Sequence, residues 1–161
     1  MNNIIKEASK VKAKIMKYNN VNQVVKLMIA MKEKYKKSVF LRSLAIELIR
    51  GRKKDDWIDI IYDYLCKIQY VPDVIGVETI QSPILTVKKQ VGDCDDISLL
   101  ASILLEAIGI RNNFVIASYN PKKKFTHIYL YVAGKLPFDP TAKKYVGFEK
   151  KGITRKRIFY T

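Results

Sequence analysis

The first part of the chain has the hydrophobic spacing of amphipathic helices. From Val21 to Ile49, apolar residues recur at steps of three and four positions, which is the period of one helix face. Lysines fall between these apolar positions, namely Lys26, Lys32, Lys34, Lys36 and Lys37. The pattern predicts a pair of helices with a lysine face toward solvent. The alternative is that the lysines form a binding surface for an anionic polymer.

A second apolar stripe, on residues 57–69, predicts a helix that begins at Asp55, where acidic side chains suit the positive end of the helix dipole. Cys66 lies beside this stripe with no charged motif around it, and we expect an inert structural thiol. Residues 71–90 carry few strong signals and are interpreted as a long connection, a kind of segment that is often functional. A continuous helix is excluded there by Pro72, Gly76 and Pro83.

The second half of the chain changes from one long apolar run to alternating strands. Residues 94–108 form the apolar run, which predicts a buried helix that ends at Gly109. Residues 113–119 and 126–133 predict two strands, and a tight turn leads into a hairpin partner at residues 136–139. The basic tail ends in a candidate edge strand. Helices followed by antiparallel strands is the order of an α+β protein.

Composition adds a charge imbalance and a scarcity of metal ligands. The 161 residues include 30 Lys and Arg against 15 Asp and Glu, a net charge of +15, and 48% apolar residues allow a packed core. Residues 1–57 carry 15 of the basic and 5 of the acidic side chains. The excess favours an anionic partner, although a lysine-rich genome composition produces the same imbalance. One His, one Trp and two Cys exclude a His-rich metal site, a zinc ribbon and a multi-disulfide scaffold.

Secretion and membrane signals are not evident in the sequence. The N-terminus lacks an uninterrupted apolar segment, and no run approaches the ~18 apolar residues of a membrane span. We therefore expect a single domain over residues 1–161, made in a reducing cytosol with both thiols free.

Cys94 has the sequence context of a nucleophile. It opens the apolar run within Gly92-Asp-Cys-Asp-Asp, so it is expected at a helix N-terminus. Free N–H groups and the helix dipole there favour a thiolate and can receive an oxyanion. The flanking aspartates raise a thiol pKa unless they point away or cap the helix, so a cationic partner is needed. A small core cysteine is the structural alternative.

The only histidine is placed to be that partner. His127 opens the strand at residues 126–133, where alternation places His127, Tyr129 and Tyr131 on one face. Asp139 lies twelve residues later, so antiparallel pairing across the hairpin brings it back beside His127. In a Cys–His–Asp order, His127 takes the thiol proton and Asp139 fixes the tautomer of the imidazole and stabilises its cation. A structural histidine and a turn-forming Asp-Pro are the alternatives, and only the ordered set favours catalysis.

These segments resemble the transglutaminase-like superfamily, which has a papain-like Cys-His-Asp site. The resemblance rests on the Gly92-Asp-Cys-Asp-Asp motif with its apolar run, on Phe125-Thr-His-Ile-Tyr-Leu-Tyr-Val and on Phe138-Asp-Pro-Thr, and it spans roughly residues 55–141. The segment that starts Tyr70-Val-Pro-Asp is similar to the branch found in bacteriophages and prophages. That branch also has a helical lead-in, which extends the resemblance back to about residue 20.

The resemblance implies a papain-like α+β fold. In it, a basic helical lead-in at residues 1–54 precedes a catalytic core at residues 55–161. A central helix that bears Cys94 would pack on an antiparallel sheet that bears His127 and Asp139. N-terminal helices would complete the single domain.

The resemblance also implies cysteine-dependent acyl transfer. Cys94 would form a thioester with an amide carbonyl and pass the acyl group to water, or to an amine as in protein cross-linking by transglutaminases. The Cys94 backbone would receive the oxyanion together with a second donor, for which Gln81 is one candidate and Gln90 another. We expect no cofactor. The spacing of Asp93, Asp95 and Asp96 lacks the alternating ligands and central glycine of a calcium loop, so no metal site is predicted.

The expected substrate is a peptide or protein amide, including a cell-wall peptide or a phage structural protein. The expected location is the cytoplasm of a bacterial host or the virion. One alternative is a phage morphogenesis or tail-associated binding protein with a little-used triad. Another is nucleic-acid binding through the basic first third, for which the sequence offers no recognition motif.

Overall fold

Helix α6 (Cys94–Ala107) lies at the centre of the structure. The computed structural model describes residues 14–16, 21–73, 78–122 and 125–161. Every residue of α6 from Asp95 to Leu105 is buried. The helix can be apolar around its whole circumference because other elements cover it on all sides. The predicted helix at residues 94–108 is therefore confirmed, and Gly109 follows it with a φ of 79°.

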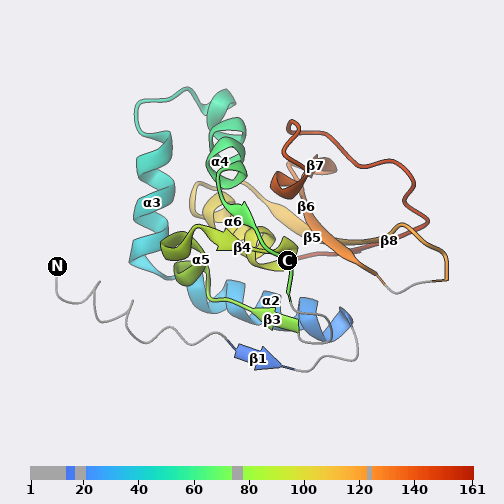
Figure 1. The fold of residues 1–161 in the computed structure, drawn as a ribbon. Helices are drawn as coiled ribbons and strands as arrows, with labels where there is room; N and C mark the ends of the chain where they lie inside the picture. The colour runs from blue at the N-terminus through green and yellow to red at the C-terminus, as the bar shows by residue number, and fades with distance from the viewer. Residues whose placement is uncertain (1–13, 17–20, 74–77, 123–124) are drawn as a thin grey trace.

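Helices from the first half of the chain pack against α6. Figure 1 shows α3 on the side of α6 that faces away from the sheet, α4 above α6 and α2 crossing below it. Ser38 caps α3 by accepting a hydrogen bond from the Leu41 N–H, and a short 3-10 turn at Lys54–Asp56 leads into α4. Both predicted helical regions are confirmed, with the bounds α2 (Val21–Tyr35), α3 (Val39–Ile49) and α4 (Trp57–Cys66).

The other side of α6 is covered by an antiparallel sheet with the strand order β7-β6-β5-β8. Its bounds are β5 (Asn112–Ser118), β6 (His127–Val132), β7 (Leu136–Phe138) and β8 (Arg155–Phe159). The register pairs Ala117 with His127 and Leu130 with Phe138. The predicted strands, hairpin and edge strand are therefore confirmed, and the fold is α+β.

The interpretation of residues 71–90 as a long connection is wrong in part. Strand β3 (Glu78–Ile80) and helix α5 (Pro83–Lys89) lie within it, while Gly76 lies outside the described residues. Pro83 begins α5 rather than breaking it, because a proline at the first helical position loses no hydrogen bond, and Ser82 caps the helix. Short strand pairs flank this segment: β1 (Lys14–Met16) with β3, and β2 (Gln69–Tyr70) with β4 (Val91–Gly92).

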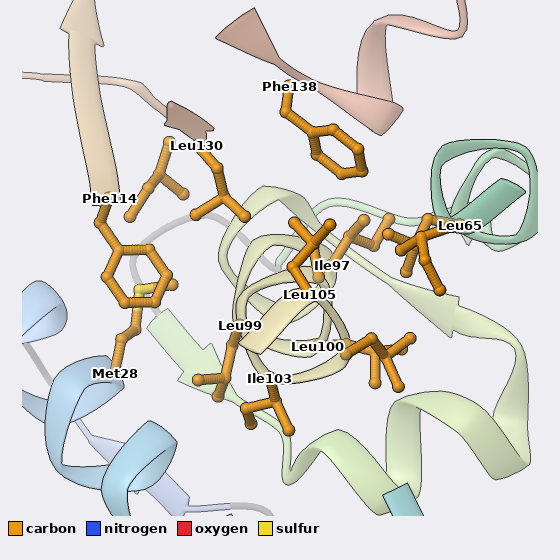
Figure 2. Close-up of a cluster of buried hydrophobic side chains, with 14 of the residues drawn as sticks. Met28, Leu65, Ile97, Leu99, Leu100, Ile103, Leu105, Phe114, Leu130 and Phe138 are labelled. Carbon is orange, nitrogen blue, oxygen red and sulfur yellow. The ribbon is translucent and has the colours of Figure 1, made fainter. Parts of the chain in front are cut away.

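One large hydrophobic cluster joins the helices to the sheet. Figure 2 shows Met28 of α2 beside Phe114 of β5, and Leu65 of α4 on the far side of α6. Leu41 and Ala45 of α3 are fully buried in the same cluster. The basic helical region before residue 55 therefore contributes core residues. None of the described helices combines the length and the apolarity needed to cross a membrane.

Lys32 departs from the predicted lysine face. Its residue surface is only 2% exposed, and its ammonium lies 2.7 Å from the Glu106 carboxylate of α6. It also donates a 2.8 Å hydrogen bond to the Thr161 hydroxyl. Lys32 can be buried on the α2 face toward α6 because its charge is paired with Glu106 of that helix. The prediction from residue spacing, which placed Lys32 on the solvent face, is therefore wrong.

Candidate active site

Cys94 is the first residue of α6, as predicted from its place before the apolar run. Asp93 is the N-cap, and one of its carboxylate oxygens accepts hydrogen bonds from the N–H groups of Asp95 and Asp96. Gly92 lets the preceding strand approach the helix closely, since a Cβ there would lie 2.9 Å from the Asp96 Cβ. The cap and the close approach together fix the position of Cys94 in the fold.

His127 and Asp139 form a direct pair. The His127 Nε2 atom lies 2.7 Å from the Asp139 Oδ2 atom, and both side chains are largely buried. Pairing of β6 with β7 produces this contact, because Asp139 directly follows β7 while His127 opens β6. With Nε2 engaged by the carboxylate, Nδ1 is the ring nitrogen left for another partner.

Further contacts hold both members of the pair in place. The second carboxylate oxygen of Asp139 accepts hydrogen bonds from the Thr141 hydroxyl at 2.6 Å and from the Thr141 N–H at 3.2 Å. The His127 ring stacks on Tyr129 with centroids 5.8 Å apart and planes at 17°. Burial alone would raise the pKa of Asp139, but the hydrogen bonds from His127 and Thr141 outweigh it and lower the pKa.

The Cys94 sulfur lies in a strongly acidic environment, close enough to Asp139 for the charge of that carboxylate to act on the thiol. Burial raises the pKa of the Cys94 thiol well above its ordinary value, and the charges of Asp95 and Asp93 raise it further. The backbone N–H of Ile128, the neighbour of His127, opposes this by a hydrogen bond that lowers the pKa. The expectation that the helix N-terminus favours a resting thiolate is therefore outweighed, because desolvation and like charge exceed the effect of the dipole.

Three buried carboxylates surround the start of α6. Asp93, Asp95 and Asp96 each offer an oxygen atom within 4.8 Å of the others. Burial and neighbouring acidic groups raise the pKa of Asp95 well above its ordinary value and that of Asp96 to about 7. Carboxylate oxygens are ligands that hard divalent cations prefer, so this donor set fits such an ion although its sequence spacing is not that of a calcium loop.

The three predicted oxyanion donors, Cys94, Gln81 and Gln90, have different hydrogen-bonding partners in the structure. The Asp93 side chain accepts hydrogen bonds from the backbone N–H groups of Asp95 and Asp96. The role of the Cys94 N–H as an oxyanion donor stays a prediction. The Gln81 amide already donates to the Asp96 carboxylate at 2.7 Å and to the Val91 carbonyl at 3.1 Å. A role for Gln81 in binding an oxyanion also stays a prediction, and it requires the amide to leave these partners. Gln90 donates to the Val87 carbonyl instead.

Sequence reasoning missed two tyrosines at this site. Tyr70 on β2 pairs across from Gly92, is 43% exposed, and lies close enough to Cys94 and Asp93 for their charges to act on its hydroxyl. Tyr62 on α4 donates a 3.1 Å hydrogen bond to the Asp139 carbonyl. Spacing could not have singled out either tyrosine, because each reaches the site through tertiary packing. Thr141, which follows Asp-Pro, was visible as a possible turn cap.

No protein-family model matches the chain, and no curated protein matches it. Solved structures do resemble it. A proposed protease from Parabacteroides distasonis superposes with a TM-score of 0.59 and 13% identity, over 80% of this chain and 35% of that one. A proposed cysteine protease from Cytophaga hutchinsonii superposes with a TM-score of 0.53 and 18% identity, over 83% of this chain and 51% of that one. The chain thus spans about a third and about a half of these two proteins.

LapG of Legionella pneumophila matches over 90% of both chains, with a TM-score of 0.57 and 13% identity. A calcium-bound structure of LapG superposes with a TM-score of 0.53 and 15% identity, over 88% of this chain and 87% of that one. None of these descriptions mentions a bacteriophage, so the predicted phage-type branch has no support. At such identities the likeness establishes the fold, and the chain has the α+β fold of papain-like cysteine proteases.

Proposed function

We propose that the protein is a cysteine peptidase that uses Cys94 as nucleophile, His127 as base and Asp139 as the group that orients the imidazole. The observation that carries the proposal is the 2.7 Å contact between His127 and Asp139, on a strand whose next residue, Ile128, donates its backbone N–H to the thiol of Cys94 at the N-terminus of a buried helix. The likeness of the fold to that of cysteine proteases supports it.

The geometry suggests an order of proton transfers. Asp139 accepts a hydrogen bond from the Nε2–H group of His127 and stays ionised, so the unprotonated Nδ1 of His127 takes the Cys94 thiol proton as the sulfur attacks an amide carbonyl. The oxyanion is received by the Cys94 N–H, and the imidazolium then protonates the departing amine. His127 next removes a proton from water, which attacks the thioester and releases a carboxylic acid and the free thiol. An amine in place of water gives the transglutaminase-type alternative.

The raised pKa of Cys94 fits a base that acts during the reaction rather than a preformed thiolate. A sulfur beside Asp93 and Asp95 keeps its proton at neutral pH, so its reactivity depends on proton transfer to His127. The substrate is a peptide or protein amide. The net charge of +15 makes anionic cell-wall peptides one class to include among the substrates tested.

The test is cleavage of a proteome-derived peptide library by the purified protein, followed by mass spectrometry of the products. Wild-type protein and the matched control Cys66→Ser should cleave the same peptides, while Cys94→Ala and His127→Ala should not. Alkylation of Cys94 by iodoacetamide gives a second measurement, since His127→Ala should slow it at neutral pH. Equal alkylation of the wild type and His127→Ala would contradict the paired nucleophile.

We also propose that Asp93, Asp95 and Asp96 hold a calcium ion. The clustered carboxylates and the calcium-bound structure of LapG support this. When bound, such an ion supplies positive charge that offsets the carboxylates next to Cys94. The measurement is thermal unfolding with calcium or with chelator, for the wild type and Asp95→Asn, with exposed Asp59→Asn as control. Stabilisation by calcium should be lost in Asp95→Asn alone. An equal melting temperature of the wild type with calcium and with chelator would overturn the proposal.

A further inference from the structure

Helix α4 contacts the turn that carries Asp139 through two hydrogen-bond donors. Tyr62 and Cys66 are four residues apart and therefore lie on the same face of α4, one turn from each other. The Tyr62 hydroxyl donates to the Asp139 carbonyl at 3.1 Å, and the Cys66 thiol donates to the Pro140 carbonyl at 3.5 Å. Two successive donors on the helix thus engage two successive carbonyls of the turn.

Tyr62 also closes this turn from its other end. Its hydroxyl oxygen accepts a 3.2 Å hydrogen bond from the Lys144 N–H while its proton goes to the Asp139 carbonyl. A short 3-10 helix, Pro140–Ala142, lies between these two points. One side chain therefore fixes both ends of the segment that begins with Asp139.

Both donors are held in place and stay protonated. Tyr62 is 3% exposed, and its ring meets Phe138 edge to face with centroids 5.3 Å apart. Burial raises the pKa of Tyr62 to about 12, and burial also raises the pKa of the Cys66 thiol. At neutral pH each group therefore keeps the proton that it donates.

We propose that Tyr62 and Cys66 are positioning residues that set the place of the Asp139 carboxylate against His127. The carboxylate is joined to its backbone by a single methylene group, so a displaced backbone moves the atom that contacts Nε2. Errors of about 1 Å in such geometry can cost about 100-fold in rate. The second cysteine, which sequence context marked as inert, thereby acquires a role in the site. This inference rests on the proposed function for its catalytic consequence, but the contact that it concerns can be measured without any substrate.

The test uses the Nε2 proton of His127 in ¹H–¹⁵N NMR, which is unambiguous because the chain has one histidine. A short hydrogen bond to a carboxylate moves this proton downfield and protects it from exchange with water. Tyr62→Phe keeps the ring and removes the hydroxyl, Cys66→Ala removes the thiol, and Cys66→Ser keeps a donor. Tyr64→Phe is the matched control, since its hydroxyl lies on the same helix but contacts the Gln90 amide at 3.4 Å.

We expect the Nε2 proton signal to move upfield and exchange faster in Tyr62→Phe and Cys66→Ala, and to stay unchanged in Cys66→Ser and Tyr64→Phe. The turnover number for a cleaved peptide should fall about threefold to tenfold in the first two variants with KM unchanged, as for the loss of one neutral hydrogen bond. An unchanged Nε2 signal in Tyr62→Phe would overturn the inference even if peptide cleavage is found. Failure of the wild type to cleave any peptide would instead refute the proposed function, while the NMR result still decides the positioning role.

Discussion

Asp139 and Asp96 are both buried carboxylates of the same site, yet their surroundings move their pKa values in opposite directions. Asp139 accepts from His127 and Thr141, and its pKa is lowered despite burial. Burial and the charge of Asp93 raise the pKa of Asp96 to about 7, although Asp96 accepts hydrogen bonds from Gln81. Because burial raises both pKa values, the difference shows that the hydrogen bonds and charges of the neighbours decide the direction of the net shift.

Cys94 lies between these two environments. Asp93, Asp95 and Asp96 form the acidic cap of α6, and burial together with the charges of Asp95 and Asp93 suppresses ionisation of the Cys94 thiol. In the proposed mechanism, the His127–Asp139 pair provides the base that removes the thiol proton. The proposed reaction therefore depends on both regions, and the following predictions weaken one region at a time.

The largest effect is expected from removal of the paired carboxylate. Asp139→Ala should lower the turnover number by at least about 100-fold, because the imidazole loses the group that fixes its tautomer and stabilises its cation. The measurement is the rate of cleavage of a peptide substrate at neutral pH. Exposed Asp63→Ala on α4 serves as the control and should retain wild-type turnover. Comparable turnover in the two variants would remove Asp139 from the mechanism.

A Cβ at position 92 tests how tightly the acidic cap is built. Gly92→Ala would place that atom 2.9 Å from the Asp96 Cβ and 3.4 Å from a Thr86 methyl group, so the start of α6 must shift. We expect a loss of about 1–3 kcal/mol in the free energy of unfolding, the usual range for overpacking. Denaturant unfolding measures it. Wild-type stability of the variant would show that the cap accommodates an extra methyl group.

Weakening the acidic cap should make Cys94 more reactive. The ionised Asp95 carboxylate raises the pKa of the Cys94 thiol; Asp95→Asn removes this charge, and its amide oxygen can still accept from the Asp96 N–H. Because the pKa of Asp95 is itself raised, alkylation of Cys94 by iodoacetamide in chelator should be faster than in the wild type at alkaline pH, where Asp95 is ionised. The rate is followed by mass spectrometry of the peptide that contains Cys94. A slower or equal rate would mean that the Asp95 charge does not reach the sulfur.

The same cap should give stability an inverse dependence on pH. Asp96 has a folded-state pKa of about 7, above the ordinary value of about 3.9, so the folded state binds more protons between these values. The free energy of unfolding contributed by this group therefore falls as pH rises from about 4 to 7. Melting temperatures in chelator at pH 5.5 and 8 measure the slope, which should be shallower in Asp95→Asn. A wild-type melting temperature that increases from pH 5.5 to pH 8 would contradict the raised pKa of Asp96.

The smallest effect is expected from an exposed carboxylate. Glu33 pairs with Lys36 at 2.7 Å on the surface of α2, where water screens the contact. Glu33→Gln should leave the melting temperature and the alkylation rate of Cys94 within experimental error. A clear change in either quantity would show that surface charge, and not only the two buried environments, acts on the site.

Much of this architecture was predictable from local pattern. The central helix, the two helical regions before it and the strands at 112–118 and 127–132 follow from apolar periodicity, and each is confirmed. Helix α5 was missed because Pro83 was taken as a breaker, whereas a proline at the first helical position is compatible with a helix. Lys32 was misplaced because its partner Glu106 is 74 positions away in sequence.

The candidate site divides in the same way. The contact of His127 with Asp139 could be predicted because a short hairpin joins the two strands, and local register fixes which residues meet. The hydrogen bond from Tyr62 to Asp139 could not be predicted, because helix packing brings together two residues that are 77 positions apart in the sequence. The effect of the aspartates on Cys94 also depended on whether they cap the helix or face the sulfur, which spacing does not reveal.

The sequence by itself determined the order of the main helices and strands apart from α5, the α+β class and the placement of Cys94 at the start of a buried helix. These features depend on local periodicity and on contacts across one hairpin. Only the tertiary structure decided which carboxylate is ionised, which side chains hold Asp139 and how the Cys94 thiol is protonated. The physical reason is that desolvation, charge and hydrogen bonding depend on distances between segments far apart in the chain, and folding alone brings these segments together.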